Sequence, residues 1–168
     1  MGSLLHRFAR DGRGAAAVEM ALVAPLLIVL LFGAFELGNY FLTEHKVVKA
    51  VRDGARYAAR QAFDQYAGCA PSSVVVDSTR NVTRTGQVAN GGTPRVLGWT
   101  NPATITVTSV CNRTGSFQNQ GIYRNLTVGA PVVIVSATVQ YTPLFAQIGL
   151  GRLTLNLNAS SEAAVTGI

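Results

Sequence analysis

The sequence predicts an α+β protein in which one long N-terminal helix, first transmembrane and then amphipathic, packs on a small antiparallel β-sheet. Three observations support this class. No residue from Met20 to Phe35 is charged, helical periodicity continues to about Phe63, and later segments alternate apolar and polar residues. The 168 residues leave room for one compact domain beside a membrane segment, because domains usually hold about 100 to 150 residues.

The apolar segment is long enough to cross a membrane. Residues 15–42 contain only two charged side chains, Glu19 and Glu36, and about 20 apolar helical residues span the hydrocarbon core. We therefore predict a transmembrane helix over 15–42, preceded by a short leader at 1–14 and followed by an extracytoplasmic αβ domain at 43–168.

The flanking charges predict the orientation. Three basic residues before the apolar segment, Arg7, Arg10 and Arg13, favour a cytoplasmic N-terminus. Two lysines soon after the segment, Lys46 and Lys49, weaken this bias. A secretory signal has a shorter apolar core, followed by its small-residue cleavage site. Here the core is longer and the small residues come first, which favours a single-pass anchor.

The helix is expected to continue to about Phe63, with Pro25 and Gly54 as possible bends. At 100° per residue one face is apolar: Val47, Val51, Ala55, Ala58 and Ala62, flanked by Val48 and Ala59. A basic stripe lies roughly opposite: Lys46, Lys49, Arg52, Arg56 and Arg60. A solvated face, contact with anionic lipid headgroups and contact with an acidic partner all remain open for this stripe.

Shorter elements follow. A cap at Ser72 or Ser73 and Gly86 at the far end favour a short helix over a strand in the segment between them. Residues 89–102 read as a loop by their glycines and prolines. Four strand-like runs follow, at 103–110, 121–128, 131–141 and 152–165. Their half-buried antiparallel sheet needs a cover, and the Val/Ala face of the long helix is available.

Cys69 and Cys111 both fall in the part predicted to lie outside, where disulfides form. One disulfide and two free thiols both fit; a disulfide would close a loop of about 40 residues and contribute roughly 3 to 4 kcal/mol. A metal site is not expected, because His6 and His45 are distant in sequence from both cysteines. Four Asn-x-Ser/Thr triplets, at Asn81, Asn112, Asn125 and Asn158, are interpreted as chance occurrences.

The sequence does not predict an enzyme. It has no glycine-rich phosphate loop and no nucleophile elbow, and beyond the long helix it has few acidic residues, Asp77 and Glu162 among them. We therefore expect no cofactor and no catalytic residue. The net charge of +6 is modest and comes without an aromatic RNA-binding pattern, so nucleic acid is not an expected partner.

Several segments of the sequence together resemble a known family. A basic leader, Gly14, the segment AAAVE, an apolar helix and AVRDGARYAAR resemble TadE-like proteins of the tight adherence (Tad) pilus system, which are minor pilins or pseudopilins related to the type IV pilin superfamily. TRNVTRTG, PRVLGWT and VQYTPLF also look like that family. The fold expected from the resemblance is pilin-like.

The resemblance implies an inner-membrane precursor that a prepilin peptidase cuts between Gly14 and Ala15. Glu19 is the fifth residue of the product, and its family counterpart is thought to pair with a neighbouring subunit's amine or to be read by the assembly platform. A carboxylate within a membrane segment is costly, which marks function; alternatively, Glu19 lies shallow enough to reach headgroup water. This chain has Met20 where the family commonly has an aromatic residue.

The resemblance implies as partners a prepilin peptidase, other Tad pilins and minor pilins, the inner-membrane assembly platform and membrane lipid. The implied function is Tad pilus assembly, adhesion and biofilm formation. The main alternative is an uncleaved single-pass anchor that carries an extracytoplasmic binding module. The two readings differ in the N-terminus of the mature protein, which is Ala15 in the first and an intact leader in the second.

Overall fold

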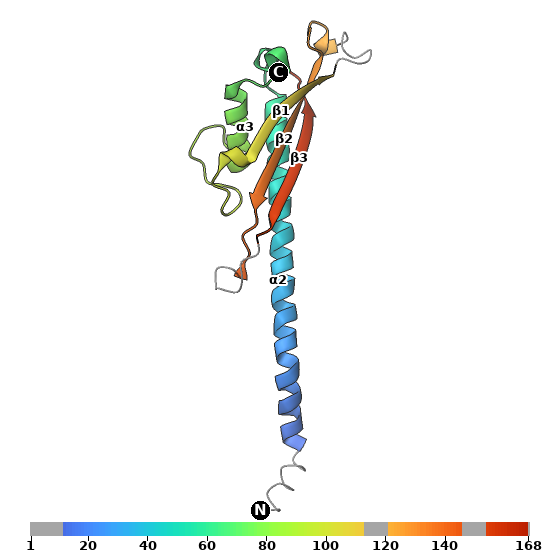
Figure 1. Ribbon diagram of the computed structural model, residues 1–168, viewed down its shortest axis with the longest axis vertical. Helices are drawn as coiled ribbons and strands as arrows, with labels where there is room; N and C mark the ends of the chain where they lie inside the picture. The colour runs from blue at the N-terminus through green and yellow to red at the C-terminus, as the bar shows by residue number, and fades with distance from the viewer. Residues whose placement is uncertain (1–11, 113–120, 146–153, 168) are drawn as a thin grey trace, which may run out of the picture. The chain divides into compact units, whose positions relative to one another are not determined.

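The computed structural model describes residues 12–112, 121–145 and 154–167, which belong to two units, Met1–Asn39 and Tyr40–Ile168. The main elements in chain order are α2 (Gly12–Ala59), η1 (Phe63–Cys69), α3 (Ser73–Thr85), β1 (Ile105–Asn112), β2 (Ala130–Gln140) and β3 (Asn156–Ala164) (Figure 1). A long helix combined with a small antiparallel sheet confirms the predicted α+β class.

The three strands form one antiparallel sheet in the order β1-β2-β3. Val135 on the central strand pairs with Val107 on one side and with Ser161 on the other. One face of β2 is buried through Val133, Val135, Ala137 and Val139. On the opposite face, hydroxyl and amide groups bond across the strands, with Ser136 3.0 Å from Ser160 and Thr138 2.9 Å from Asn158. The predicted alternation is therefore confirmed.

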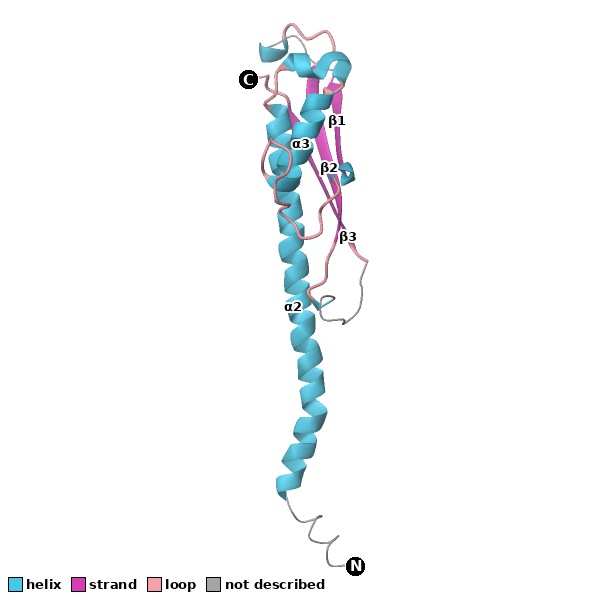
Figure 2. Ribbon diagram, turned by 90° about the vertical axis from the view of Figure 1, so that its left-hand side faces the viewer, coloured by secondary structure: helices cyan, strands magenta, loops and turns pink. Residues whose placement is uncertain are grey.

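The second part of α2 covers the buried face of the sheet. Its small apolar residues join one core with the inward residues of the strands, as the arrangement of α2, α3 and the sheet in Figure 2 illustrates. Val51 and Ala58 are fully buried there. The helix ends at Ala59 rather than near Phe63, so the expectation that Ala62 lies on the apolar face was wrong: Ala62 follows the last turn and is exposed.

The short helix α3 has the caps that the sequence predicts. The Ser72 hydroxyl accepts a hydrogen bond from the Val75 N–H, and Gly86 adopts a left-handed conformation with φ of 81°. α3 packs closely on α2 at Gly54, where a side-chain carbon would collide with Thr83. Gly54 lies inside an unbroken helix, so its role in the fold is close approach rather than bending.

The segment 121–128 is not the strand that its apolar residues predict. It forms a 3₁₀ turn, η4 (Gly121–Tyr123), followed by further turns in which Leu126 N–H donates to Tyr123 C=O and Gly129 N–H to Leu126 C=O. Tyr123 packs edge-on against Phe63 and donates from its hydroxyl to the Val165 carbonyl at 2.9 Å. These tertiary contacts tie the segment to η1 and to the residue that follows β3.

Contacts from distant segments fix the C-terminal end of α2. The Tyr66 hydroxyl donates to the Ala58 carbonyl at 2.6 Å, and the Thr166 N–H donates to the Ala59 carbonyl at 2.7 Å. The last carbonyls of a helix have no partner within it, so these bonds satisfy groups that would otherwise need water. Nearby, a disulfide between Cys69 and Cys111 joins η1 to β1, with 5.8 Å between the Cα atoms.

Candidate functional site

The first part of α2, up to Asn39, presents its apolar side chains outward. Leu22 is 75% exposed and Val29 is 68% exposed, and no residue in the most apolar window of the helix is buried; that window has a mean hydropathy of 2.5. Among the described residues this is one helix with the length and composition to cross a membrane. An apolar surface of this kind requires lipid or other apolar helices around it.

Gly14 and Ala15 lie near the start of this helix. Both are exposed, and a side-chain carbon added to Gly14 would meet nothing within 4 Å. The first turn also contains Gly12 and has no acidic residue to complement the helix dipole. Glycine is about 1 kcal/mol less favourable than alanine in a helix, so the two glycines weaken this first turn.

Glu19 is exposed one helical turn after Ala15. Residues four apart lie on the same side of a helix, separated by about 6 Å of rise, so the Glu19 carboxylate and the Ala15 nitrogen share one face. Ala16, Met20 and Val23 line a shallow hollow together with Glu19. Met20 is 66% exposed and keeps the surroundings of the carboxylate apolar.

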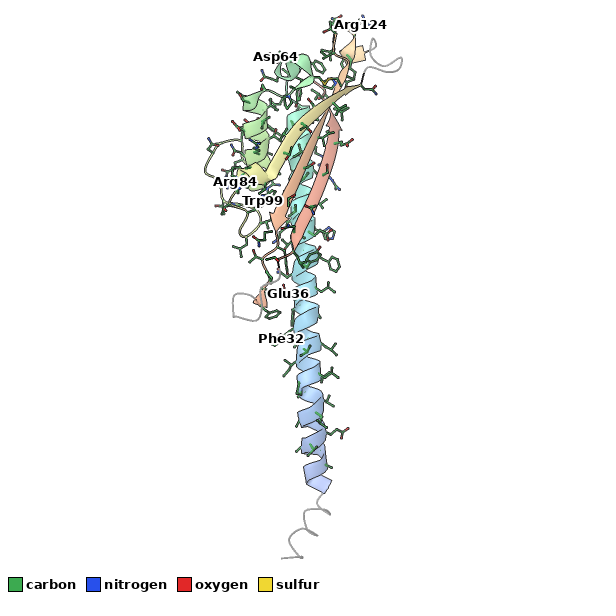
Figure 3. The ribbon with its side chains drawn as sticks, in the orientation of Figure 1. Phe32, Glu36, Asp64, Arg84, Trp99 and Arg124 are labelled. Carbon is green, nitrogen blue, oxygen red and sulfur yellow. A yellow bond between two sulfur atoms is a disulfide. The ribbon has the colours of Figure 1, made fainter. Side chains whose placement is uncertain are left out.

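Glu36 is the other acid of the apolar segment, and it does not join the Gly14–Glu19 group. It lies about 26 Å of helical rise beyond Glu19, half-buried and one turn from Phe32 (Figure 3). The two carboxylates therefore lie near opposite ends of the apolar segment. Glu19 alone is placed to interact with a group at Ala15.

Sequence reasoning missed the interactions that anchor the long loop before β1. Arg95 Nη1 lies 2.7 Å from the Asp53 carboxylate on α2, and the Trp99 indole N–H donates to the Thr104 hydroxyl at 2.9 Å. Asp53 and Arg95 are 42 residues apart, so no local pattern could have identified the pair. The first contact ties the loop to α2, and the second stabilises the loop just before β1.

The described residues form no metal centre. They contain no group of three His, Cys, Asp or Glu side chains that could hold a metal ion. One strong pKa shift concerns a structural residue: burial raises the pKa of the Tyr66 phenol to about 12, at a position where its hydroxyl bonds to the end of α2. The chemically distinctive feature is therefore the N-terminal part of α2.

Comparison with known proteins gives one family. Residues 14–56 match the model of the TadE-like protein family; the match begins at Gly14 and ends within α2, before the sheet. No curated protein and no solved structure matches the chain. The resemblance seen in the sequence is thereby confirmed over most of the long helix: residues 14–56 are similar to the TadE-like family, and the helix that contains them has the length and composition to cross a membrane.

Proposed function

We propose that this chain is a minor pilin or pseudopilin of a Tad pilus, made as an inner-membrane precursor with its N-terminus in the cytoplasm. A prepilin peptidase cuts it between Gly14 and Ala15. The product takes part in pilus assembly, and through the pilus in adhesion and biofilm formation. Its partners are the peptidase, other Tad pilins and minor pilins, the assembly platform and membrane lipid.

The observation that carries this proposal is the exposed apolar surface of α2 within the TadE-like segment. Before assembly that surface lies in lipid, and after assembly it packs against the helices of other pilins. The same apolar side chains serve in both places, so the transfer leaves no apolar surface in water. The unit Tyr40–Ile168, which this proposal places outside the membrane and which is called the outer unit below, is bulky relative to a thin pilus shaft. This favours a position at the tip or in priming assembly.

The charges near the cut support the role of Glu19. Cleavage creates a positive amine on Ala15 at the N-terminus of the helix, where the helix dipole is already positive. A carboxylate one turn away offsets both the amine and the dipole, either within the chain or across to a neighbour's amine. An uncut chain lacks this amine, so Glu19 would remain a costly charge without a partner.

Mass spectrometry of protein extracted from membranes tests the cut. We expect an Ala15 amino terminus in cells that contain a prepilin peptidase. The Gly14→Val variant should keep its leader, while Gly12→Val, the same change two residues before Gly14, should still be processed. An intact leader in the wild-type chain beside an active peptidase would contradict the proposal and favour the uncleaved anchored binding module.

The role of Glu19 needs a separate test. Glu19→Gln preserves the size of the side chain and removes its charge, so we expect normal cleavage but loss of the protein from the sheared pilus fraction. Glu36→Gln makes the same chemical change in the same segment and should assemble. Equal assembly of both variants would exclude an assembly role for Glu19 without affecting the cleavage result.

A further inference from the structure

The basic stripe predicted on the second part of α2 is fully displayed in the structure. All five side chains are exposed: Lys46, Lys49, Arg52, Arg56 and Arg60. By helical periodicity the four members within α2 lie opposite to the buried residues Val51, Ala55 and Ala58, while Arg60 directly follows the end of the helix at Ala59. Successive members are three or four residues apart, so like charges are neighbours on the helix surface, an arrangement that disfavours the isolated helix.

The described part of the chain does not neutralise this stripe. Its two salt bridges are Arg80–Asp77 and Arg95–Asp53, and neither includes a member of the stripe. Asp53 is on the same helix near the edge of the stripe, but Arg95 already holds its carboxylate at 2.7 Å. A favourable helix dipole explains Arg56 in the last turn. It does not explain Lys46, Lys49 or Arg52, which lie further from that end.

A second copy of this chain cannot complement the stripe. Residues 43–168 contain five acidic side chains, Glu44, Asp53, Asp64, Asp77 and Glu162, and two of them are already paired within the chain. Glu44 points away from the stripe by helical periodicity, while Asp64 and Glu162 belong to η1 and β3. No row of acids exists, and two copies that met through their stripes would repel each other.

Lipid headgroups match only the beginning of the stripe. Lys46 to Arg56 covers about 15 Å of helical rise, whereas one headgroup layer is about 5 to 8 Å thick. A helix that lies flat on a membrane buries its apolar face there, but here the sheet covers that face. Headgroups can therefore engage Lys46 and Lys49 of an upright helix but not the arginines beyond them.

We propose that the basic stripe is the docking surface for a different subunit, which presents a row of acidic side chains along a helix or strand at least 15 Å long. This inference rests on the proposed function only in taking the partner to be another pilus subunit. Complementary charge steers the partner into register, and repulsion between stripes keeps copies of this chain apart. The outer unit thus binds a different subunit in preference to a second copy of this chain.

Site-specific photo-crosslinking in cells tests the proposal on the full chain. A photoreactive amino acid replaces Tyr57, which is half-buried beside the stripe, and mass spectrometry sequences the crosslinked peptide. We expect an adduct with a different pilus subunit at a segment rich in Asp and Glu. Arg52→Glu with Arg56→Glu should reduce the yield at least tenfold, and reversing the acids of the partner segment should restore it.

The control is the charge reversal Arg124→Glu, which leaves all five residues of the stripe unchanged. Arg124 is exposed on the turn after η4, where Figure 3 labels it, and it is far from α2 in sequence. Its reversal should leave the yield within about twofold. Loss of the outer fold is excluded by unchanged fluorescence of the single tryptophan, the buried Trp99.

Three outcomes overturn the proposal: an adduct between two copies of this chain, an adduct with lipid alone, or a yield that the Arg52 and Arg56 reversals do not change. Flotation of the purified chain with phosphatidylglycerol vesicles, compared with phosphatidylcholine vesicles, identifies the lipid case directly. The result is separable from that of the proposed function, because cleavage after Gly14 is read from the N-terminus and does not depend on the stripe.

Discussion

The two parts of α2 share one helical backbone and differ in what covers their apolar side chains. Val29 in the first part is 68% exposed, whereas Val51 in the second is completely buried against the sheet and α3. The first part is apolar on all sides, while the second confines its apolar residues to one face and carries charge on the other. The apolar side chains of the second part are covered within the chain, whereas those of the first part remain exposed.

The strongest contrast should come from one substitution placed in each part. Val51→Asp buries a carboxylate without a partner and should destabilise the outer unit by more than about 4 kcal/mol, with loss of the buried-tryptophan fluorescence. Val29→Asp should leave that fluorescence unchanged in detergent and weaken membrane insertion by roughly 2.5 to 3.5 kcal/mol, measured by alkaline extraction. Equal effects of both variants on Trp99 would mean that the two parts do not differ as described.

Removing the disulfide should affect only the outer unit. The Cys69→Ala, Cys111→Ala double variant releases a bridge between residues 42 apart, which the loop-entropy relation values at roughly 3 to 4 kcal/mol. Denaturant unfolding of the full chain in detergent, followed by Trp99 fluorescence, measures the change. Reduction of the wild-type chain provides the control and should give a similar loss. An unchanged midpoint in both cases would exclude a stabilising bridge.

For the stability of the fold, glycine should be needed at Gly54 in the second part of α2 and dispensable at Gly38 in the first part. Gly54→Ala pushes a methyl group into Thr83, and overpacking of this kind costs about 1 to 3 kcal/mol, partly offset by the better helix propensity of alanine. A side-chain carbon at Gly38 meets nothing within 4 Å, so Gly38→Ala should leave the melting temperature of the outer unit unchanged. A neutral Gly54→Ala would argue against close packing of α2 and α3.

The smallest effect should come from Tyr66→Phe at the end of α2. It removes the 2.6 Å hydrogen bond to the Ala58 carbonyl, which is worth about 1 kcal/mol; the loss stays small because Gln61 N–H also donates to that oxygen.

The same residue predicts a pH dependence. Burial raises the pKa of Tyr66 to about 12 from its ordinary value of 10.0, so the folded state retains the proton after the unfolded state has lost it. The stabilisation is complete below pH 10 and disappears as pH rises toward 12. Over this interval the wild-type chain should lose more stability than Tyr66→Phe. Parallel curves for the two proteins would contradict the assignment.

The local sequence pattern was enough to predict the helices and strands that have a regular hydrophobic periodicity or clear capping residues. The helix, its apolar and basic faces, the capped α3 between Ser72 and Gly86, and strands near β1, β2 and β3 all follow from spacing or from capping residues within a few positions. The candidate site was equally local, since Gly14, Ala15 and Glu19 form a short motif. The structure adds that all three are exposed and that Ala15 and Glu19, four residues apart, lie on the same side of the helix.

Tertiary structure decided what depends on residues far apart in the chain. The apolar residues of 121–128 suggested a strand, but Tyr123 bonds to Val165, 42 residues away, and holds the segment in turns. The end of α2 was expected near Phe63 and lies at Ala59, where Thr166, 107 residues later, bonds to the last carbonyl. Periodicity predicts which face of a segment is buried. It cannot predict where the segment ends when a residue distant in sequence fixes that end, because the contact depends on the folded path of the whole chain.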